Sequence, residues 1–297
     1  MRLFRLGLGD DSFWALGDND AEAGRAWRIG NPFEHWAPRL AAEGAGALDL
    51  APQPLRLVDH CLLPPLEPGA RVFGVGLNYL AHLQRLGSQA PAHPLAYIKP
   101  ASALVGALDP IAYPPMTAAL DYEVELVAVM AAPLAETGPA SASVLGYTLG
   151  NDTSARDAGK QIGRLDLLTQ KAMDRTTPVG PCIVTAKALG VVGQPALDFA
   201  LWVNGEQRQA DNTGNMIFTL DELLNYLDAR IALRPGDMVF TGSSHGVGLE
   251  DGRFLRPGDL VRASIKGIGE LRNRITPPRQ LSPDRALGRL GGPEHSP

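Results

Sequence analysis

The sequence predicts a mainly β fold with few helices (α+β), on three observations. Glycine (33 residues) and proline (25 residues) are frequent and spread along the chain, which favours short strands joined by tight turns. Apolar runs of strand length recur after residue 71, each bounded by Gly, Pro, Asn or Asp. Strong helix signals are confined to one segment, residues 219–229.

Changes of composition divide the chain into three parts. Residues 1–65 contain short strand-like runs and are expected to form a small N-terminal domain. The segment PLEPGA at 65–70 makes a boundary through its prolines and glycine. Residues 66–276 are expected to form the main domain, and residues 277–297, without periodicity, a flexible C-terminal tail.

Six apolar runs predict strands of the main domain. The runs are RVFGVG (71–76), VELVAVM (124–130), CIVT (182–185), LDFALWV (197–203), DMVFTG (237–242) and DLVRASI (259–265). The segment LRPGDMVF at 233–240 nearly repeats as LRPGDLVR at 255–262, which predicts two similar Pro-Gly turns, each leading into a strand.

Three helices are expected. Residues 219–229 begin with a capping box, Thr219 and Glu222, followed by an apolar stripe of four leucines. A second helix is expected to start near Ser154, with the neighbouring hydroxyl groups as caps. A third is expected over 78–85.

Charge and composition exclude several classes of protein. The formal net charge is −5 and the basic residues are scattered, which argues against a nucleic-acid surface. No apolar run approaches the roughly 20 residues that cross a bilayer, and no signal-length segment is seen, so we expect a cytoplasmic protein without a membrane partner. Cys61 and Cys182 are too few for a disulfide framework and are expected to be reduced.

Acidic residues alternate with apolar ones in the segment DYEVELVAV at 121–129. In a strand, Asp121, Glu123 and Glu125 would share one face, with the two glutamate Cα atoms about 6.5–7 Å apart. A solvated strand face is the plain alternative. The apolar run that follows indicates a central strand, on which acids need compensation by a metal or by paired basic side chains. A hard-cation site meets that need.

Further chemistry-bearing residues follow along the chain. The segment GYTLGNDTSARD at 146–157 supplies a third carboxylate, Asp152. Lys171 stands alone between apolar segments, and TGSSHGVG at 241–248 is a glycine-rich loop of the kind that presents backbone N–H groups to anions.

The order of motifs over residues 71–275 resembles the fumarylacetoacetate hydrolase superfamily, near its acylpyruvase-like branch. The motifs are GVGLNYLAH, IKPASALVG, DYEVEL, GYTLGNDTSARD, QKAMDRTTPVGP, VNGEQRQ, MIF, LRPGDMVFTG and GVG. The resemblance implies a mixed β-roll core in the catalytic domain, residues 66–276, and a homodimer. It also implies Mg²⁺ (or Mn²⁺) held by Glu123, Glu125 and Asp152.

The same resemblance implies roles for other side chains. His82 matches the family's general base, Lys171 the lysine that contacts metal-bound oxygens or substrate, and Arg156 the arginine after the aspartate. Ser243 stands where the glycine-rich loop usually has threonine. The remaining candidates, for substrate binding, are Arg85, Asn78 and His245.

The implied activity is hydrolysis of a C–C bond in a β-diketone or acylpyruvate-type small acid, with the metal as Lewis acid stabilising an enolate. Two departures leave alternatives open. Arg85 stands where many relatives have a glutamate that orients the histidine, and Ala158 begins a stretch that replaces a usual glutamine. The alternatives are a decarboxylase, isomerase, tautomerase or dehydratase of a 2-oxo acid, or a catalytically idle metal-binding relative.

Overall fold

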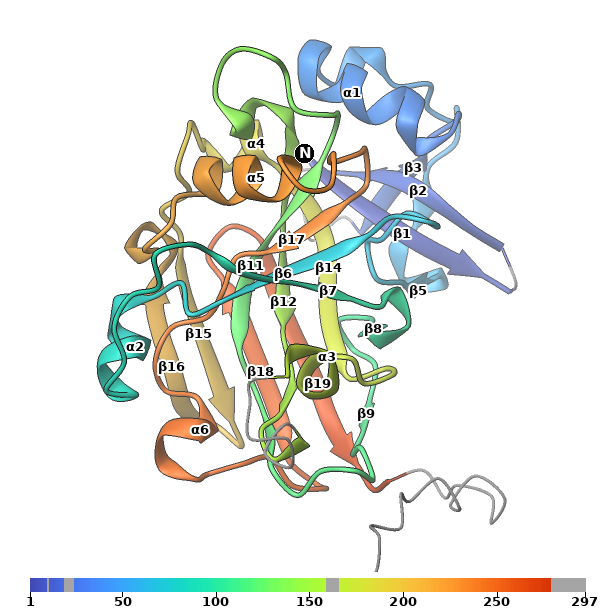
Figure 1. Ribbon diagram of the computed structural model, residues 1–297. Coiled ribbons are helices and arrows are strands. Elements are labelled where there is room, and N and C mark those ends of the chain that lie inside the picture. The colour runs from blue at the N-terminus through green and yellow to red at the C-terminus, as the bar shows by residue number, and fades with distance from the viewer. Residues whose placement is uncertain (10, 19–23, 159–165, 279–297) are drawn as a thin grey trace, which may run out of the picture.

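A computed structural model describes residues 1–9, 11–18, 24–158 and 166–278. Two β-sheets make up most of the fold and six α-helices of the described residues lie around them (Figure 1), which confirms the mainly β class. The flexible tail expected at 277–297 lies outside the described residues from 279 on.

The larger sheet has twelve strands and runs through the whole molecule. In spatial order its path is β4 (Leu55–Arg56), β3 (Arg25–Arg28), β2 (Asp11–Gly17), β1 (Arg2–Leu8), β14 (Thr177–Thr185), β12 (Val144–Asn151), β11 (Val124–Met130), β17 (Met238–Phe240), β6 (Val72–Gly76) and β7 (Leu95–Lys99). Beside this path, β5 (Cys61–Leu62) pairs with β1, and β8 (Leu104–Val105) pairs with β14. Strands of residues 1–65 therefore extend the sheet of the main domain, and their separation as a domain stays a prediction.

The second sheet has five strands, all from the main domain. In order they are β16 (Glu206–Asn212), β15 (Asp198–Val203), β18 (Leu260–Ile265), β19 (Gly269–Thr276) and β9 (Ile111–Ala112). A separate pair joins β10 (Leu120–Asp121) to β13 (Ser154–Ala155). Each of the six apolar runs thus contributes a strand, as predicted.

The glycines of the two LRPGD turns have the positive φ expected of a Pro-Gly turn, 86° at Gly236 and 101° at Gly258.

The helices are short and surround the sheets. They are α1 (Phe33–Glu43), α2 (Leu80–Arg85), α3 (Leu167–Lys171), α4 (Ala186–Leu189), α5 (Leu220–Asp228) and α6 (Gly248–Asp251). Single 3₁₀ turns occur at η1 (Ala45–Ala47), η2 (Leu57–Asp59), η3 (Ala101–Ala103), η4 (Ala140–Ser143) and η6 (Thr213–Asn215). The capping box predicted at Thr219 and Glu222 is present at α5, and a helix is present within 78–85. None of the described helices is long and apolar enough to span a bilayer.

The helix expected near Ser154 was wrong. Ser154 lies in β13, which pairs antiparallel with β10. The hydroxyl groups predicted as helix caps donate to carbonyl groups, Thr153 to Thr176 O (2.9 Å) and Ser154 to Asp152 O (3.2 Å). Among the described residues, no backbone N–H donates to either hydroxyl group, as it would in a helix cap.

Strand β11 is buried on both faces. Its residues Val124, Leu126 and Ala128 lie in one core cluster with residues of the five-stranded sheet. On the other face, Val127 and Val129 lie in a second cluster that includes the aromatic residues of α1. Glutamates on such a strand lie in the interior, as the following apolar run indicated.

Strand directions bring four segments to one edge of the large sheet. β17 is parallel to β6 and antiparallel to β11, so both β6 and β17 end where β11 begins. β12 also ends there, because Asn151 pairs with Val124. The segments that follow β6, β12 and β17 therefore meet the first residues of β11, and this edge holds the site.

Candidate active site

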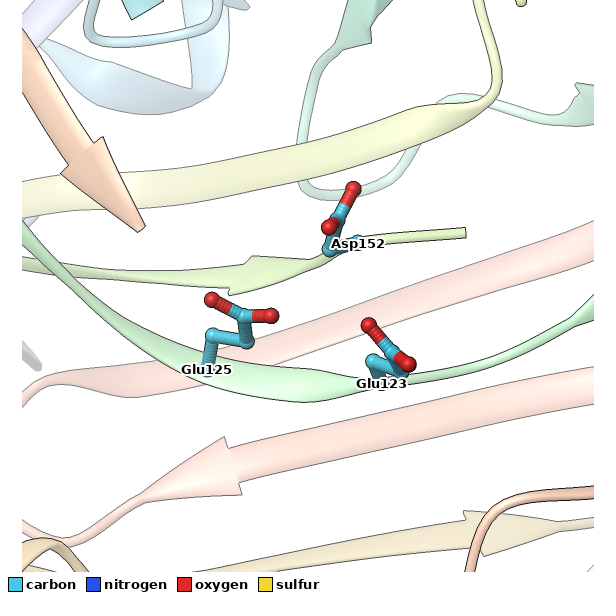
Figure 2. A group of neighbouring side chains, drawn as sticks. All are labelled: Glu123, Glu125 and Asp152. Carbon is cyan, nitrogen blue, oxygen red and sulfur yellow. The ribbon is translucent and has the colours of Figure 1, made fainter. Parts of the chain in front are cut away.

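Three buried carboxylates lie at the start of β11 and the end of β12. One oxygen each from Glu123, Glu125 and Asp152 lies within 4.8 Å of the others. Figure 2 shows the two glutamates on one segment of chain, with Asp152 on the neighbouring segment and all three side chains on the same side. The group predicted from the sequence is therefore assembled, and it is the only such acidic or metal-ligating trio among the described residues.

Backbone pairing sets this arrangement. The Asp152 N–H donates to Glu123 O (2.8 Å), and the Glu123 N–H donates to the side-chain oxygen of Asn151 (2.9 Å). These bonds continue the β11–β12 pairing by one residue beyond the Val124–Asn151 pair. The aspartate is thereby held directly beside the first glutamate.

Glu125 is the least compensated of the three acids. No Lys or Arg of the described residues forms an ion pair with Glu125, and the Gly242 N–H (2.8 Å) is its hydrogen-bond donor. Burial, with Asp152 and Glu123 nearby, raises the pKa of Glu125 well above its usual value. Gly242 has φ 95°, and a Cβ there would lie 2.7 Å from the Cβ of Asn78, so this donor position requires glycine.

Lys171 bridges the other two carboxylates. Its Nζ lies 2.5 Å from Glu123 Oε2 and 2.7 Å from Asp152 Oδ2. Burial opposes ionisation of both acids, but the nearby positive charges together outweigh it, Lys171 and Arg156 at Glu123 and Lys171 and Lys99 at Asp152. The pKa of each carboxyl therefore lies below its usual value. Burial lowers the pKa of Lys171, and the two acids more than restore it.

Arg156 is held from two sides. Its guanidinium group donates to Asp121 Oδ2 (Nε, 2.8 Å) and to Glu123 Oε1. Asp121 also accepts the backbone N–H groups of Gly248 and Leu249 at the start of α6. Asp121 therefore stands apart from the metal-ligand trio and connects Arg156 to α6.

Two residues that the sequence reading missed lie on Asp152. The Tyr97 hydroxyl donates to Asp152 Oδ2, and Lys99 Nζ lies 3.0 Å from Oδ1. Both come from β7, two positions apart and so on one face, a period that was visible in LAYIK. Gly74 on the paired strand makes room, because a Cβ there would lie 2.3 Å from the Tyr97 ring.

The side chains present fit a divalent cation. Three buried carboxylates, with one oxygen each within 4.8 Å of the others, are the oxygen donors that Mg²⁺ and Mn²⁺ prefer. Four buried acids face two buried lysines and an arginine whose side chain is 9% exposed, which leaves one negative charge in excess. The members are Asp121, Glu123, Glu125, Asp152, Lys99, Lys171 and Arg156. A divalent ion would reverse that excess to one positive charge, which suits a monoanionic ligand.

His82 has a carboxylate partner that comes from a distant part of the chain. Its Nδ1 lies 2.7 Å from Glu250 Oε1, and both side chains are at least nine-tenths buried. Glu250 also accepts the Gly246 N–H (2.9 Å), which holds it in place. Arg85 stands where many relatives have the glutamate that orients the histidine. In this chain α6 supplies that carboxylate, from a residue 168 positions after His82.

Two predicted site residues make internal hydrogen bonds. Asn78 is fully buried. Its side-chain NH₂ group donates to the backbone carbonyls of Phe218 and Thr241, and its side-chain oxygen accepts from the Phe218 N–H. Ser243 donates to Val124 O (2.9 Å) and accepts from Gln209. The hydrogen bonds of both side chains connect the segments around the site to one another. Asn78 and Ser243 thus bind other parts of the protein.

The remaining candidates, Arg85 and His245, line a cavity of about 370 Å³ together with Glu250. Arg85 is exposed and His245 is partly buried.

The model of the fumarylacetoacetate (FAA) hydrolase C-terminal domain matches residues 71–276, well over half of the chain. The protein therefore belongs to this family.

Relatives with different activities share this fold. A mitochondrial oxaloacetate tautomerase of Bos taurus is 35% identical over 219 residues, which are 72% of this chain and 68% of that protein. The crystal structure of 2-hydroxyhepta-2,4-diene-1,7-dioate isomerase from Mycobacterium marinum has a TM-score of 0.75 at 31% identity, over 94% of this chain and 100% of that one. The family thus includes isomerases and tautomerases.

It also includes hydrolases. Fumarylpyruvate hydrolase from Pseudomonas aeruginosa, solved with Mn²⁺ and pyruvate, has a TM-score of 0.62 at 34% identity, over 69% of this chain and 89% of that one. Membership of this enzyme family and the buried acidic trio together indicate a metal-binding enzyme.

Proposed function

We propose that the protein is a Mg²⁺- or Mn²⁺-dependent enzyme that moves a proton on the carbon next to the carbonyl of a small 2-oxo acid, as an isomerase or tautomerase. The observation that carries this is the His82–Glu250 pair at the same sheet edge as the carboxylate trio. A divalent ion held by Glu123, Glu125 and Asp152 would polarise the oxo acid and acidify that carbon.

The residues of the chain supply the remaining steps. Because the Glu250 carboxylate binds His82 Nδ1, the other ring nitrogen, Nε2, accepts the proton. The carboxylate also stabilises the imidazolium that results. Returning the proton to a different atom of the same molecule completes the reaction. Lys171 and Arg156 add positive charge close to the bound acid. One base is sufficient for this reaction, and no oriented water is required.

Hydrolysis of a C–C bond in an acylpyruvate-type acid is the second candidate. The same His82–Glu250 pair can take a proton from water instead of carbon, and the pyruvate-bound relative from Pseudomonas aeruginosa is a hydrolase. This reaction places an additional demand on the site, because a water molecule must be held against the second carbonyl.

One experiment separates the two. The protein, first freed of metal and then supplied with Mg²⁺, is incubated in D₂O with oxaloacetate or with an acylpyruvate, and proton NMR follows the C3 signal. We expect metal-dependent loss of that signal without a cleavage product. Metal-dependent release of pyruvate from the acylpyruvate would select the hydrolase instead. No metal-dependent change in either compound would reject both.

Glu250→Gln tests the acid–base pair. The glutamine oxygen can still accept from His82 Nδ1, but the charge that stabilises the imidazolium is lost, so we expect kcat to fall about 10–100-fold. KM, metal affinity and melting temperature should stay near those of the parent protein. Glu206→Gln, which removes an exposed carboxylate paired with Arg253, is the matched control and should leave kcat unchanged. Equal kcat in the two variants would argue against a role for Glu250.

A further inference from the structure

The acid–base pair depends on the position of the short helix α6. Glu250 belongs to α6, and its Oε1 lies 2.7 Å from Nδ1 of His82 in α2, so a displacement of α6 would alter that hydrogen bond. The two helices lie on the same side of the molecule (Figure 1), although they are far apart in the chain. The contacts that hold α6 in place therefore also set the geometry of the pair.

Asp121 holds the beginning of α6. Its carboxylate is fully buried and accepts the backbone N–H groups of Gly248 (2.6 Å, to Oδ1) and Leu249 (3.0 Å, to Oδ2). The helix lies close against this carboxylate, because a Cβ on Gly248 would lie 2.8 Å from Asp121 Oδ1. The residue after Leu249 is Glu250. Asp121 is thus bonded to the two residues that directly precede the partner of His82.

The same carboxylate is connected to the metal-ligand trio. Asp121 Oδ2 also accepts from Arg156 Nε (2.8 Å), and another nitrogen of that guanidinium group donates to Glu123. The side chains of Asp121 and Arg156 are at least nine-tenths buried, so water and salt screen their ion pair much less than they would on the surface. A continuous chain of contacts therefore runs from Glu123 through Arg156 and Asp121 to α6.

Asp121 itself belongs to neither half of the site. It is not one of the three carboxylates of the metal-ligand trio. Within the described residues, its hydrogen bonds go to backbone N–H groups and to Arg156, and none goes to His82 or Glu250. Both of its oxygens accept from donors of the protein, so it can affect the reaction only through the groups that it holds.

We propose that Asp121 is a positioning residue, which holds Glu250 against His82 through α6 and fixes that pair relative to the metal-ligand trio through Arg156. The distance between the base and a bound oxo acid then depends on one buried carboxylate, and small displacements of a reacting group are costly in rate. This inference rests on the proposed function, because it takes His82 and Glu250 as the acid–base pair.

The hydrogen bond between His82 and Glu250 can be followed without metal, substrate or turnover. Proton NMR of the protein with isotopically labelled histidine reports the ring N–H protons, and His82→Gln identifies the His82 signal by removing it. In Asp121→Asn, the amide presents N–H groups where α6 and Arg156 need acceptors. We expect the His82 signal to move upfield or to be lost to exchange with water, because the hydrogen bond lengthens.

Turnover at saturating Mg²⁺ gives the second measurement. Asp121→Asn should lower kcat about 10–100-fold in the parent protein. In a protein that already carries Glu250→Gln, the same substitution should lower kcat by no more than about twofold, since both residues act on one hydrogen bond. Two independent losses would instead multiply, and that result would contradict the positioning role.

Asp237→Asn is the matched control for loss of a buried aspartate. Asp237 also accepts from one arginine side chain, that of Arg71, and from backbone N–H groups, those of Arg71 and Arg234. It precedes β17, at the end of that strand farther from the site. Asp237→Asn should lower the melting temperature, as Asp121→Asn does, but should leave the His82 signal and kcat unchanged.

Gly248→Ala is the companion variant, because its methyl group displaces α6 from Asp121 while every carboxylate stays in place. It should move the His82 signal in the same direction. An unchanged signal in either Asp121→Asn or Gly248→Ala, or an equal change in Asp237→Asn, would overturn the positioning role and leave the proposed function intact. If Glu250→Gln does not move the signal, the His82–Glu250 pair is rejected, and the proposed function with it.

Discussion

Replacing His82 with alanine is expected to lower kcat by about 10²–10⁴-fold, the usual contribution of a positioned general base. Metal affinity should stay at the level of the parent protein, because His82 is not one of the three carboxylates that would hold the ion. Steady-state kinetics on the 2-oxo acid that the parent protein turns over measures the first, and titration with Mn²⁺ measures the second.

Alanine at this position also leaves the buried Glu250 carboxylate without its side-chain partner, which can destabilise α6. His82→Gln is therefore the companion variant, since its amide can donate to Glu250 but cannot act as a base. Both variants should lose turnover, and His82→Gln should keep the melting temperature. Turnover retained in either folded variant would exclude His82 as the base.

Glu125→Gln is expected to stabilise the metal-free protein and to abolish metal binding. The raised pKa of Glu125 means that its ionised form is disfavoured in the folded state, so the cost to stability grows as pH rises above a glutamate's usual value of about 4.3. Removing the charge relieves this cost, and each kcal/mol gained raises the melting temperature by roughly 2–4 °C. Metal affinity should fall more than about 100-fold, since loss of an outer partner alone costs up to that much.

Glu123→Gln is the matched control, and we expect it to change the melting temperature in the opposite direction. The pKa of Glu123 is lowered, so its ionised form stabilises the fold above about pH 4.3, and that contribution is lost as pH falls through the lowered value. The substitution leaves Lys171 and Arg156 short of one acid and should lower the melting temperature at neutral pH. Thermal unfolding from pH 4 to 8 measures both variants. Equal shifts in both would contradict the difference in charge compensation.

The two glutamates of the metal-ligand trio and the strands were predictable because their signals are local. The alternation that separates Glu123 and Glu125 from Val124 and Leu126 depends only on the geometry of an extended chain. The same holds for the capping box of α5, which involves residues three positions apart. The motif order added Asp152, which local geometry alone does not connect to the glutamates.

The residues that were missed depend on contacts between distant segments. Glu250 reaches His82 across 168 positions, and Tyr97 reaches Asp152 across 55, so neither pairing has a local pattern. The helix expected at Ser154 failed for a related reason. Hydroxyl side chains are equally suited to a helix cap and to bonding carbonyl groups, and here the pairing of β13 with β10 decided between them.

Several strands end at the same edge of the sheet, but the metal-ligand trio and the residues beside it belong to different parts of the chain. In evolution the two sets can therefore change separately. The trio lies at the start of β11 and the end of β12, where the pairing of the two strands fixes the positions of its members. His82, Arg85, His245 and Glu250 belong to the segments that follow β6 and β17, which tolerate new sequences. A duplicated gene can thus acquire a new reaction by altering these two segments, while it inherits the ion-binding framework unchanged.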